Sequence, residues 1–156
     1  MSGFDNADPA FGTDGVRARA LSDLSPEFAL RIGRAVARIL PERRMFIAHD
    51  PRVSGPILEA ALSAGLAAEG VDIELLGMLP TPAIAAVSAR ESVPGIIVTA
   101  SHNPYSDNGI KVFAAGGRKL SDEAQFAIES ELENLRTESV RETEATGGSI
   151  TRRLDA

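Results

Sequence analysis

The amino-acid sequence predicts a three-layer α/β/α fold around a mostly parallel, mixed sheet with one late hairpin strand. Two observations point to this fold. Short apolar runs alternate with segments of helical periodicity, an alternation typical of parallel sheets that carry helices on their faces. Aromatic residues make up only 4% of the chain, so the core must be packed from Ala, Val, Ile and Leu, as it is in layered α/β proteins.

Four helices are predicted, each from a start signal that precedes apolar residues at helical spacing. The start signals are Ser25-Pro26, Ser54, Thr81-Pro82 and Ser121. A hydroxyl at such a position can cap the first turn, and a Pro there forfeits no hydrogen bond. The first helix should end near Pro41, the second at Gly70 and the third near Ala89. In the fourth we expect Phe126 and Ile128 on the buried side.

Four strands are predicted from short apolar runs over residues 45–48, 71–76, 96–98 and 110–114. The third run is continuous, which indicates a strand that is buried on both faces. Asn108-Gly109 favours the positive φ angles of a tight turn. We therefore expect the chain to turn there and the last strand to pair back as a hairpin. Residues 1–136 should form one domain, and the polar, Gly-containing residues 137–156 a linker.

The composition excludes several classes of protein. The chain of 156 residues has no Cys, so it forms no disulfide and no thiolate metal site. No apolar run approaches the roughly 20 residues of a membrane span, and the first residues lack the pattern of a signal peptide. The net charge is −6, and no basic stripe with interleaved aromatic residues indicates nucleic-acid binding. We expect a cytoplasmic protein with no membrane or nucleic-acid partner.

The segment Thr99-Ala100-Ser101-His102-Asn103-Pro104 follows a buried strand and brings a hydroxyl, an imidazole and an amide together. Ligands of parallel sheets gather at the carboxyl ends of strands. Phosphoryl transfer needs an oxygen that carries the group and cations that neutralise its charge. Ser101 can be this carrier, with Arg17 and Lys111 as candidate cations. From composition alone, a polar turn whose side chains bond the backbone explains the same residues.

Three motifs together resemble the N-terminal domain of the α-D-phosphohexomutases. They are FGTDGVR at 11–17, HDPRVSG at 49–55 and TASHNPYSDNGIKVF at 99–113. Their order and spacing also match, and the similarity covers nearly the whole chain. A lone SHNP is a weak signal, whereas TASHNP followed by DNGIK and preceded by FGTDG is highly specific.

The resemblance implies a mutase that moves phosphate between the 1- and 6-positions of a hexose through a bisphosphorylated intermediate. Ser101 would carry the phosphoryl group, and an oxygen of its phosphate would be a ligand of Mg²⁺. His102 would shape the catalytic loop, Arg17 would help to hold the transferring group, and Lys111 would assist proton movement. The resemblance also assigns Thr13, Arg17 and Asn103 to phosphate or substrate binding.

Other residues of these motifs have structural interpretations. We expect Asp50 and Arg52 to form an ion pair that fixes their loop. His49 is interpreted as an ordinary residue at a strand end, and Asp14 as a residue that serves the geometry of its Gly-flanked segment. A Ser101-His102 hydrolase is disfavoured, because adjacent residues on an extended segment point apart and no G-x-S-x-G elbow surrounds the Ser.

Within the family, the motifs are most similar to the phosphoglucosamine mutase branch, which converts glucosamine 6-phosphate to glucosamine 1-phosphate. Ala18 and Thr99 stand where that branch usually has Gly and Ser, so phosphomannomutase and phosphoglucomutase specificities stay open. The family's metal loop, sugar-selecting loop and second phosphate loop belong to three further domains. We expect these domains in the same polypeptide as partners, and no turnover by residues 1–156 alone. The alternative is a non-catalytic binding or assembly module.

Overall fold

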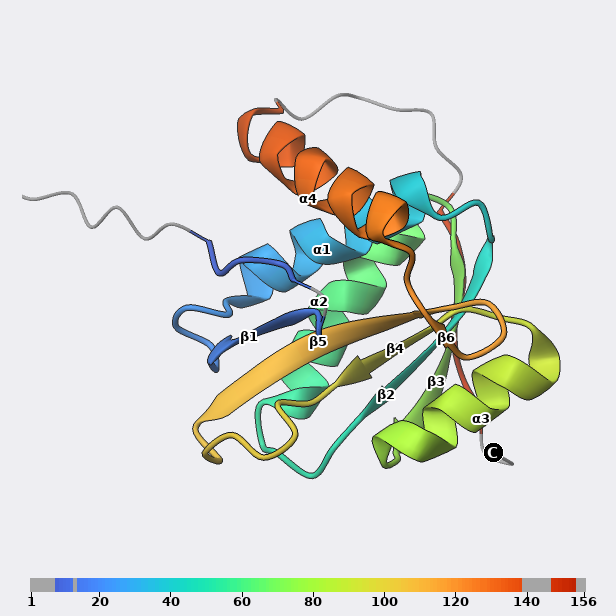
Figure 1. Ribbon diagram of the computed structural model, residues 1–156, viewed down its shortest axis with the longest axis horizontal. Coiled ribbons are helices and arrows are strands. Elements are labelled where there is room, and N and C mark those ends of the chain that lie inside the picture. The colour runs from blue at the N-terminus through green and yellow to red at the C-terminus, as the bar shows by residue number, and fades with distance from the viewer. Residues whose placement is uncertain (1–7, 13, 139–146, 154–156) are drawn as a thin grey trace, which may run out of the picture.

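The computed structural model describes residues 8–12, 14–138 and 147–153. One sheet lies between two layers of helices (Figure 1). The helices are α1 (Pro26–Ile39), α2 (Gly55–Ala68), α3 (Thr81–Glu91) and α4 (Asp122–Thr137). The strands are β1 (Val16–Arg19), β2 (Arg44–His49), β3 (Asp72–Met78), β4 (Gly95–Val98), β5 (Asp107–Ala114), β6 (Arg118–Lys119) and β7 (Ile150–Arg152). None of the helices in this part of the chain has the length and apolar character that crossing a membrane requires.

The sheet has the strand order β1-β5-β4-β2-β3-β7, and β6 pairs with β5. Strands β4, β2, β3 and β7 are parallel to one another, whereas β5 is antiparallel to both β4 and β1. The sheet is therefore mostly parallel and mixed, as the sequence predicts. Because β5 runs against β4, the start of β5 lies beside the carboxyl end of β4.

The two faces of the sheet have separate hydrophobic cores. The larger core lies between the sheet and helices α1, α2 and α4 and includes Phe28, Ile47 and Leu62. The smaller core lies under α3 and includes Phe46 and Ile84. Strand β4 contributes to both, because Ile96 and Val98 face the larger core while Ile97 faces the smaller one. This confirms a strand buried on both faces.

Two of the four predicted helix caps are formed as expected. The hydroxyl of Ser25 accepts a hydrogen bond from the N–H of Phe28, and that of Ser121 accepts one from the N–H of Ala124. The other two predictions are wrong. Ser54 precedes α2 but does not cap it, and Thr81 lies inside α3, whose N-cap is Pro80. In α4, Ile128 is buried as predicted, but Phe126 is exposed.

The expected turn at Asn108-Gly109 is also wrong, because both residues lie inside β5. The chain instead turns over residues 99–106, and β5 then pairs antiparallel with β4 as a late hairpin strand. Packing overrides the turn preference of the dipeptide. Asn108 is fully buried, and a Cβ on Gly109 would lie 2.5 Å from the carbonyl oxygens of Thr99 and Val16. Gly109 thus serves close backbone approach, not a turn.

Part of the stretch interpreted as a linker takes part in the sheet. Strand β7 pairs in parallel with β3 at the sheet edge. The carboxylate of Asp72 accepts hydrogen bonds from the N–H and the hydroxyl of Ser149, both within 2.9 Å. Arg153, which follows β7, forms an ion pair with Glu91 at the end of α3. Residues 147–153 therefore pack against the domain formed by the preceding elements.

Candidate active site

Ser101 lies in the loop that follows β4, and its side chain is exposed. Its φ angle is +53°, in the left-handed region that residues with a Cβ seldom adopt. The N–H of Ser101 donates a hydrogen bond to the hydroxyl oxygen of Thr99, at 3.0 Å. An uncommon backbone conformation with its own hydrogen-bond support is typical of a functional loop.

The loop before α2 supports the Ser101 loop through Asp50. The hydroxyl of Thr99 donates to Oδ2 of Asp50 at 2.7 Å. The same carboxylate forms an ion pair with the guanidinium of Arg52 and accepts a hydrogen bond from the N–H of Arg52 at 3.1 Å. The predicted ion pair is therefore present, and it joins the two loops to each other.

Arg52 is buried, with 7% of its surface exposed. Its Nη2 donates to the carbonyl oxygen of Ser101 at 3.2 Å and to that of Asn103 at 2.9 Å. A buried guanidinium requires a counter-charge and acceptors for its N–H groups. Asp50 supplies the counter-charge and the two loop carbonyls are the acceptors, so Arg52 holds the Ser101 loop from within the protein.

Asn103 and Tyr105 make further hydrogen bonds that support the loop. Asn103 donates from its backbone N–H to the carbonyl of Ala100 at 3.0 Å and from its side chain to Asp107 at 3.3 Å. The hydroxyl of Tyr105 lies 3.2 Å from both the N–H of Val53 and the carbonyl oxygen of Pro51. The Asn103 amide, predicted to bind phosphate or substrate, thus contacts Asp107 in this structure.

Asn108 and Ser54 form a second connection between β5 and the start of α2. The side-chain amide of Asn108 donates to the hydroxyl of Ser54 at 2.8 Å, and its oxygen accepts from the N–H of Gly109 at 2.8 Å. Both side chains are buried. The hydroxyl of Ser54 is therefore bonded to β5, which explains why it does not cap α2.

Arg17 and Lys111 lie on the same face of the sheet. Val16 and Ile110 face the core under α1 and α2, so the residues next to them, Arg17 and Lys111, face the side of α3. Arg17 is paired with Gly109 across the two strands, which makes Lys111 its diagonal neighbour. The ammonium of Lys111 lies 5.3 Å from the ring centre of Phe113. The sheet thus presents both predicted cations on one face, and neither side chain forms a hydrogen bond or ion pair with another described residue.

The two histidines occupy different environments. His102 is exposed and makes no hydrogen bond or ion pair with a described residue. His49 is half-buried at the end of β2, and its Nδ1 donates to the carbonyl oxygen of Asp50 at 2.8 Å. Nearby on α2, burial raises the pKa of the Glu59 carboxyl, and the charges of His49 and Arg152 offset part of the rise.

The N-terminal motif is described in part. Gly12 and Gly15 exchange two backbone hydrogen bonds of 2.8 and 3.0 Å, which closes a small loop with Asp14 exposed at its tip. A role of Asp14 in the geometry of that loop stays a prediction. Thr13, predicted to bind phosphate or substrate, lies outside the described residues.

Mg²⁺ needs about six oxygen ligands in octahedral geometry. Within residues 8–12, 14–138 and 147–153, no three acidic or histidine side chains are grouped so as to hold a metal ion. Of the carboxylates that contact the Ser101 loop, that of Asp50 is paired with Arg52 and that of Asp107 accepts a hydrogen bond from Asn103. This part of the chain does not form a magnesium site by itself.

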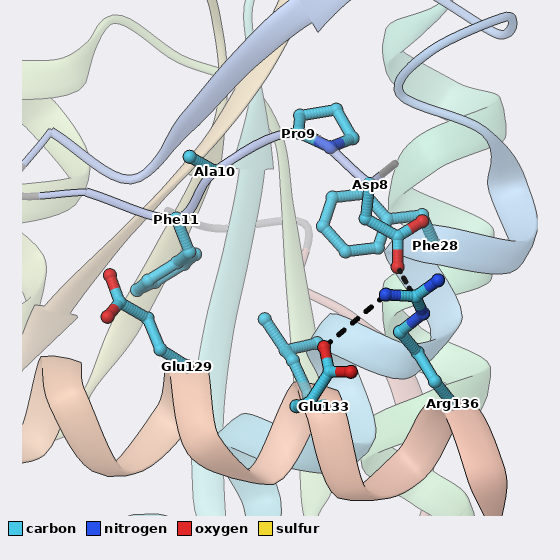
Figure 2. Close-up of a pocket in the computed structure, with 9 residues that line it drawn as sticks. Asp8, Pro9, Ala10, Phe11, Phe28, Glu129, Glu133 and Arg136 are labelled. Carbon is cyan, nitrogen blue, oxygen red and sulfur yellow. Dashed lines mark hydrogen bonds and ion pairs between the residues drawn. The ribbon is translucent and has the colours of Figure 1, made fainter. Parts of the chain in front are cut away.

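A pocket of about 310 Å³ lies away from the Ser101 loop, between the segment before β1 and helices α1 and α4 (Figure 2). Its apolar lining includes Phe11, Phe28 and Leu132. At its rim, Arg136 forms ion pairs with Asp8 and Glu133. No residue of the loop after β4 lines this pocket, so it is not part of the candidate active site.

The sequence predicts that Ser101 follows a buried strand, and the structure confirms this position, but the connections that hold Ser101 were not predicted. The roles of Thr99, Asn108 and Ser54 were not predicted, and Arg52 was predicted only as a partner of Asp50. The one available signal was the density of Asp, Arg and hydroxyl residues in two segments that both follow strands of a parallel sheet. The spacing of residues along the sequence does not predict which atoms of the two segments form hydrogen bonds with each other.

A family model described as phosphoglucomutase/phosphomannomutase, alpha/beta/alpha domain I, matches residues 8–139. Among curated relatives, the phosphoglucosamine mutase of Saccharopolyspora erythraea is 47% identical over 152 residues, 93% of this chain and 33% of that protein. The phosphoglucosamine mutase of Desulforudis audaxviator is 53% identical over 124 residues, 76% of this chain and 28% of that protein.

Solved structures give the same result. A putative phosphomannomutase from Thermus thermophilus superposes with a TM-score of 0.79 at 28% identity, over 94% of this chain and 33% of that chain. A phosphoglucomutase/phosphomannomutase family protein from Burkholderia thailandensis superposes with a TM-score of 0.75 at 30% identity, over 91% of this chain and 32% of that chain. This chain spans about a third of the length of the curated relatives it matches. The chain therefore belongs to the phosphoglucomutase/phosphomannomutase family and carries its α/β/α domain I.

Proposed function

We propose that this chain is the serine-bearing domain of a phosphohexose mutase and that Ser101 carries the phosphoryl group. The observation that supports this most is the position of Ser101: its side chain is exposed after β4 while its backbone is bonded to the partly buried Thr99 and the buried Arg52. A carrier oxygen must reach substrate and yet be held in a defined orientation. This arrangement meets both requirements.

The proposed reaction has two balanced transfers. In the first, the free hydroxyl oxygen of a hexose monophosphate attacks the phosphorus on Ser101, the bond between phosphorus and Ser101 Oγ breaks, and the proton of the hydroxyl ends on Oγ. In the second, Oγ attacks the other phosphate of the resulting bisphosphate, and the proton returns to the sugar oxygen that is released. Lys111 is proposed to assist these proton movements.

Arg17 is proposed to neutralise the charge that spreads over the equatorial oxygens of the transferring group. Its guanidinium is exposed on the same face as Lys111, without a described carboxylate partner, and is thus available for a phosphate. His102 is proposed to shape the loop. Thr13 and Asn103 are proposed to contact the phosphate or the substrate. The side-chain amide of Asn103 would first have to break its hydrogen bond to Asp107.

A magnesium ion would supply a positive charge that neutralises the phosphate on Ser101. One oxygen of that phosphate is proposed as a ligand. The described residues hold no grouped acidic side chains that would complete the coordination. The other ligands must therefore come from outside them, and we propose that they come from further domains of the same polypeptide.

The preferred substrate is proposed to be glucosamine 6-phosphate, which becomes glucosamine 1-phosphate. Support comes from curated relatives that are named phosphoglucosamine mutases, at 47% and 53% identity. Two solved structures with phosphomannomutase or phosphoglucomutase in their names are 30% and 28% identical. Mannose and glucose phosphates are the alternative substrates.

Activity is proposed to require a longer polypeptide, because the chain spans about a third of its relatives and sugar recognition is assigned to no segment within it. Such a polypeptide would work on soluble metabolites, and we propose the cytoplasm as its location. Residues 1–156 alone are expected to fold without turning over substrate.

The test is a mutase assay on the full-length polypeptide that carries these residues, with glucosamine 6-phosphate as substrate and a catalytic amount of its 1,6-bisphosphate. Ser101→Ala should abolish turnover. Ser92→Ala is the matched control, because Ser92 is also exposed with a φ angle of +54° but ends α3. Near-normal turnover by Ser101→Ala would refute the carrier role, and no turnover by the unmodified polypeptide with any hexose phosphate would favour a non-catalytic module.

A further inference from the structure

The hydrogen bonds around Ser101 form a closed ring. The N–H of Ser101 donates to Thr99, the hydroxyl of Thr99 donates to Asp50, Arg52 is paired with Asp50, and Nη2 of Arg52 donates back to the carbonyl oxygen of Ser101. The ring therefore holds the Ser101 backbone on both sides of its Cα atom. The left-handed conformation of Ser101 is disfavoured without such support.

The guanidinium of Arg52 is suited to this ring for reasons of shape and charge. One terminal nitrogen contacts Asp50 while the other donates to two carbonyl oxygens of the Ser101 loop. A planar guanidinium can serve three acceptors in fixed directions, whereas the ammonium of Lys cannot reproduce this fork. Arg52 has only 7% of its surface exposed, and Asp50 is its described counter-charge. Replacement of either charge alone would leave the other buried and unpaired.

Thr99 connects the ring to the amide of Ser101, and only its hydroxyl takes part. It accepts from the N–H of Ser101 at 3.0 Å and donates to Asp50 at 2.7 Å. A Ser at position 99 would keep both bonds, whereas a Val would keep the shape of the side chain and lose both. The two substitutions therefore separate the hydrogen bonds from the packing.

We propose that Arg52 and Thr99 are positioning residues that fix Ser101 in its left-handed conformation and so aim Oγ at the substrate. This inference rests on the proposed function of Ser101. Neither residue touches substrate. They act through the backbone of Ser101, so their loss should lower kcat and leave KM nearly unchanged, because neither residue is itself a proposed contact of the sugar phosphate.

The first experiment measures steady-state kinetics of the full-length polypeptide with glucosamine 6-phosphate. Thr99→Val and Arg52→Lys should each lower kcat by about tenfold to a hundredfold, the range expected for a misplaced reacting group, with KM changed by less than about twofold. Thr99→Ser should retain kcat within about twofold. The kcat of the double variant Thr99→Val/Arg52→Lys should be little lower than that of either single variant, because the effects of substitutions within one hydrogen-bond network do not add.

The second experiment measures amide hydrogen exchange by NMR in the chain of 156 residues. In the unchanged chain, the amide of Ser101 should exchange more slowly than that of His102, whose N–H has no hydrogen-bond partner among the described residues. Thr99→Val should remove this difference and Thr99→Ser should keep it. This readout needs no enzymatic activity, so it tests the ring even if the proposed function fails.

The outcomes are distinct. If the unchanged full-length polypeptide interconverts no hexose phosphates, the proposed function fails while the exchange measurement still tests the ring. If Thr99→Val and Arg52→Lys keep normal kcat, or if Ser101 and His102 amides exchange equally fast in the unchanged chain, the positioning role is overturned. If Thr99→Val does not fold, Arg52→Lys and the exchange rates of the unchanged chain decide between the same two results.

Discussion

The side-chain amide of Asn108 donates a hydrogen bond of 2.8 Å to the hydroxyl of Ser54 in the buried interior. The two residues are 54 positions apart in the sequence. Their bond joins the start of β5, which follows the Ser101 loop, to the start of α2. It therefore couples the two loops of the candidate active site at their base.

Loss of this bond should destabilise the domain. Asn108→Ala leaves the buried hydroxyl of Ser54 and the N–H of Gly109 without their partner, which should cost about 1–3 kcal/mol of the free energy of unfolding. The measurement is urea denaturation followed by circular dichroism. Asn134→Ala is the control, because the Asn134 amide bonds Glu131 on the exposed surface of α4. A cost as small as that of the control would contradict the proposed coupling.

Gly109 should tolerate no side chain. A Cβ at this position would lie 2.5 Å from the carbonyl oxygens of Thr99 and Val16 and 3.0 Å from Cγ of Arg17. Gly109→Ala must therefore push β1 or the end of β4 away from β5, at a cost of about 1–3 kcal/mol. Thermal unfolding of Gly109→Ala and Gly12→Ala checks this, because a Cβ on Gly12 would come within 4 Å of only one described atom beyond its chain neighbours, at 3.9 Å. Equal melting temperatures would refute the close approach.

The contact between α1 and α2 also depends on glycine. A Cβ on Gly65 would collide with the carbonyl oxygen of Leu30, and one on Gly33 with that of Leu62. Each backbone thus fills the space that a side chain on the other helix would need. We expect Gly65→Ala to destabilise the domain by about 1–3 kcal/mol, although Ala is the better helix former. Ala64→Gly, at the next and exposed position of α2, is the control for helix propensity, and its cost should be about 1 kcal/mol.

Glu59 should give the domain a component of stability that decreases as pH rises. Burial raises the pKa of its carboxyl above the ordinary value of 4.5. Between the ordinary and the raised pKa, the folded state binds more protons than the unfolded state, so the free energy of unfolding falls as pH increases. Above the raised pKa this component is lost.

Glu59→Gln removes the titration and should therefore gain stability relative to the unchanged chain as pH rises from 4 to 7. The measurement is the difference in free energy of unfolding between variant and unchanged chain across this range. Glu27→Gln, which replaces an exposed carboxylate in the first turn of α1, is the control and should show no such gain. A difference for Glu59→Gln that is constant or declines with pH would contradict the burial argument.

The sequence predicts the layers, four of the strands and the position of Ser101 after a buried strand, because these follow from local periodicity and from caps such as Ser25 and Ser121. It fails where distant contacts decide. Asn108-Gly109 is a turn by local preference, but Asn108 bonds Ser54 and Gly109 lies between two neighbouring strands. Phe126 fits a buried helical stripe by hydropathy but is exposed, because α4 packs along α1 through Ile128 and its neighbours.

The candidate site is predictable to a similar degree. Motif resemblance predicts Ser101, Arg17 and Lys111 as site residues, whereas the position of Arg17 and Lys111 on one face follows from the pairing of β1 with β5 in the structure. The pairing of Arg52 with loop carbonyls is not predictable from residue types, because backbone acceptors leave no trace in a sequence. The same holds for β7, whose three residues pair with β3 although their composition is polar.

The central claim is that Ser101 is the oxygen to which phosphate is transferred. Its most direct test is intact-mass and peptide-mapping measurement after the full-length polypeptide has been exposed to glucosamine 1,6-bisphosphate. We predict a mass increase of one phosphoryl group on the peptide that contains Ser101, and none in Ser101→Ala. An unchanged mass, or a phosphoryl group that maps to another residue and persists in Ser101→Ala, would contradict the assignment.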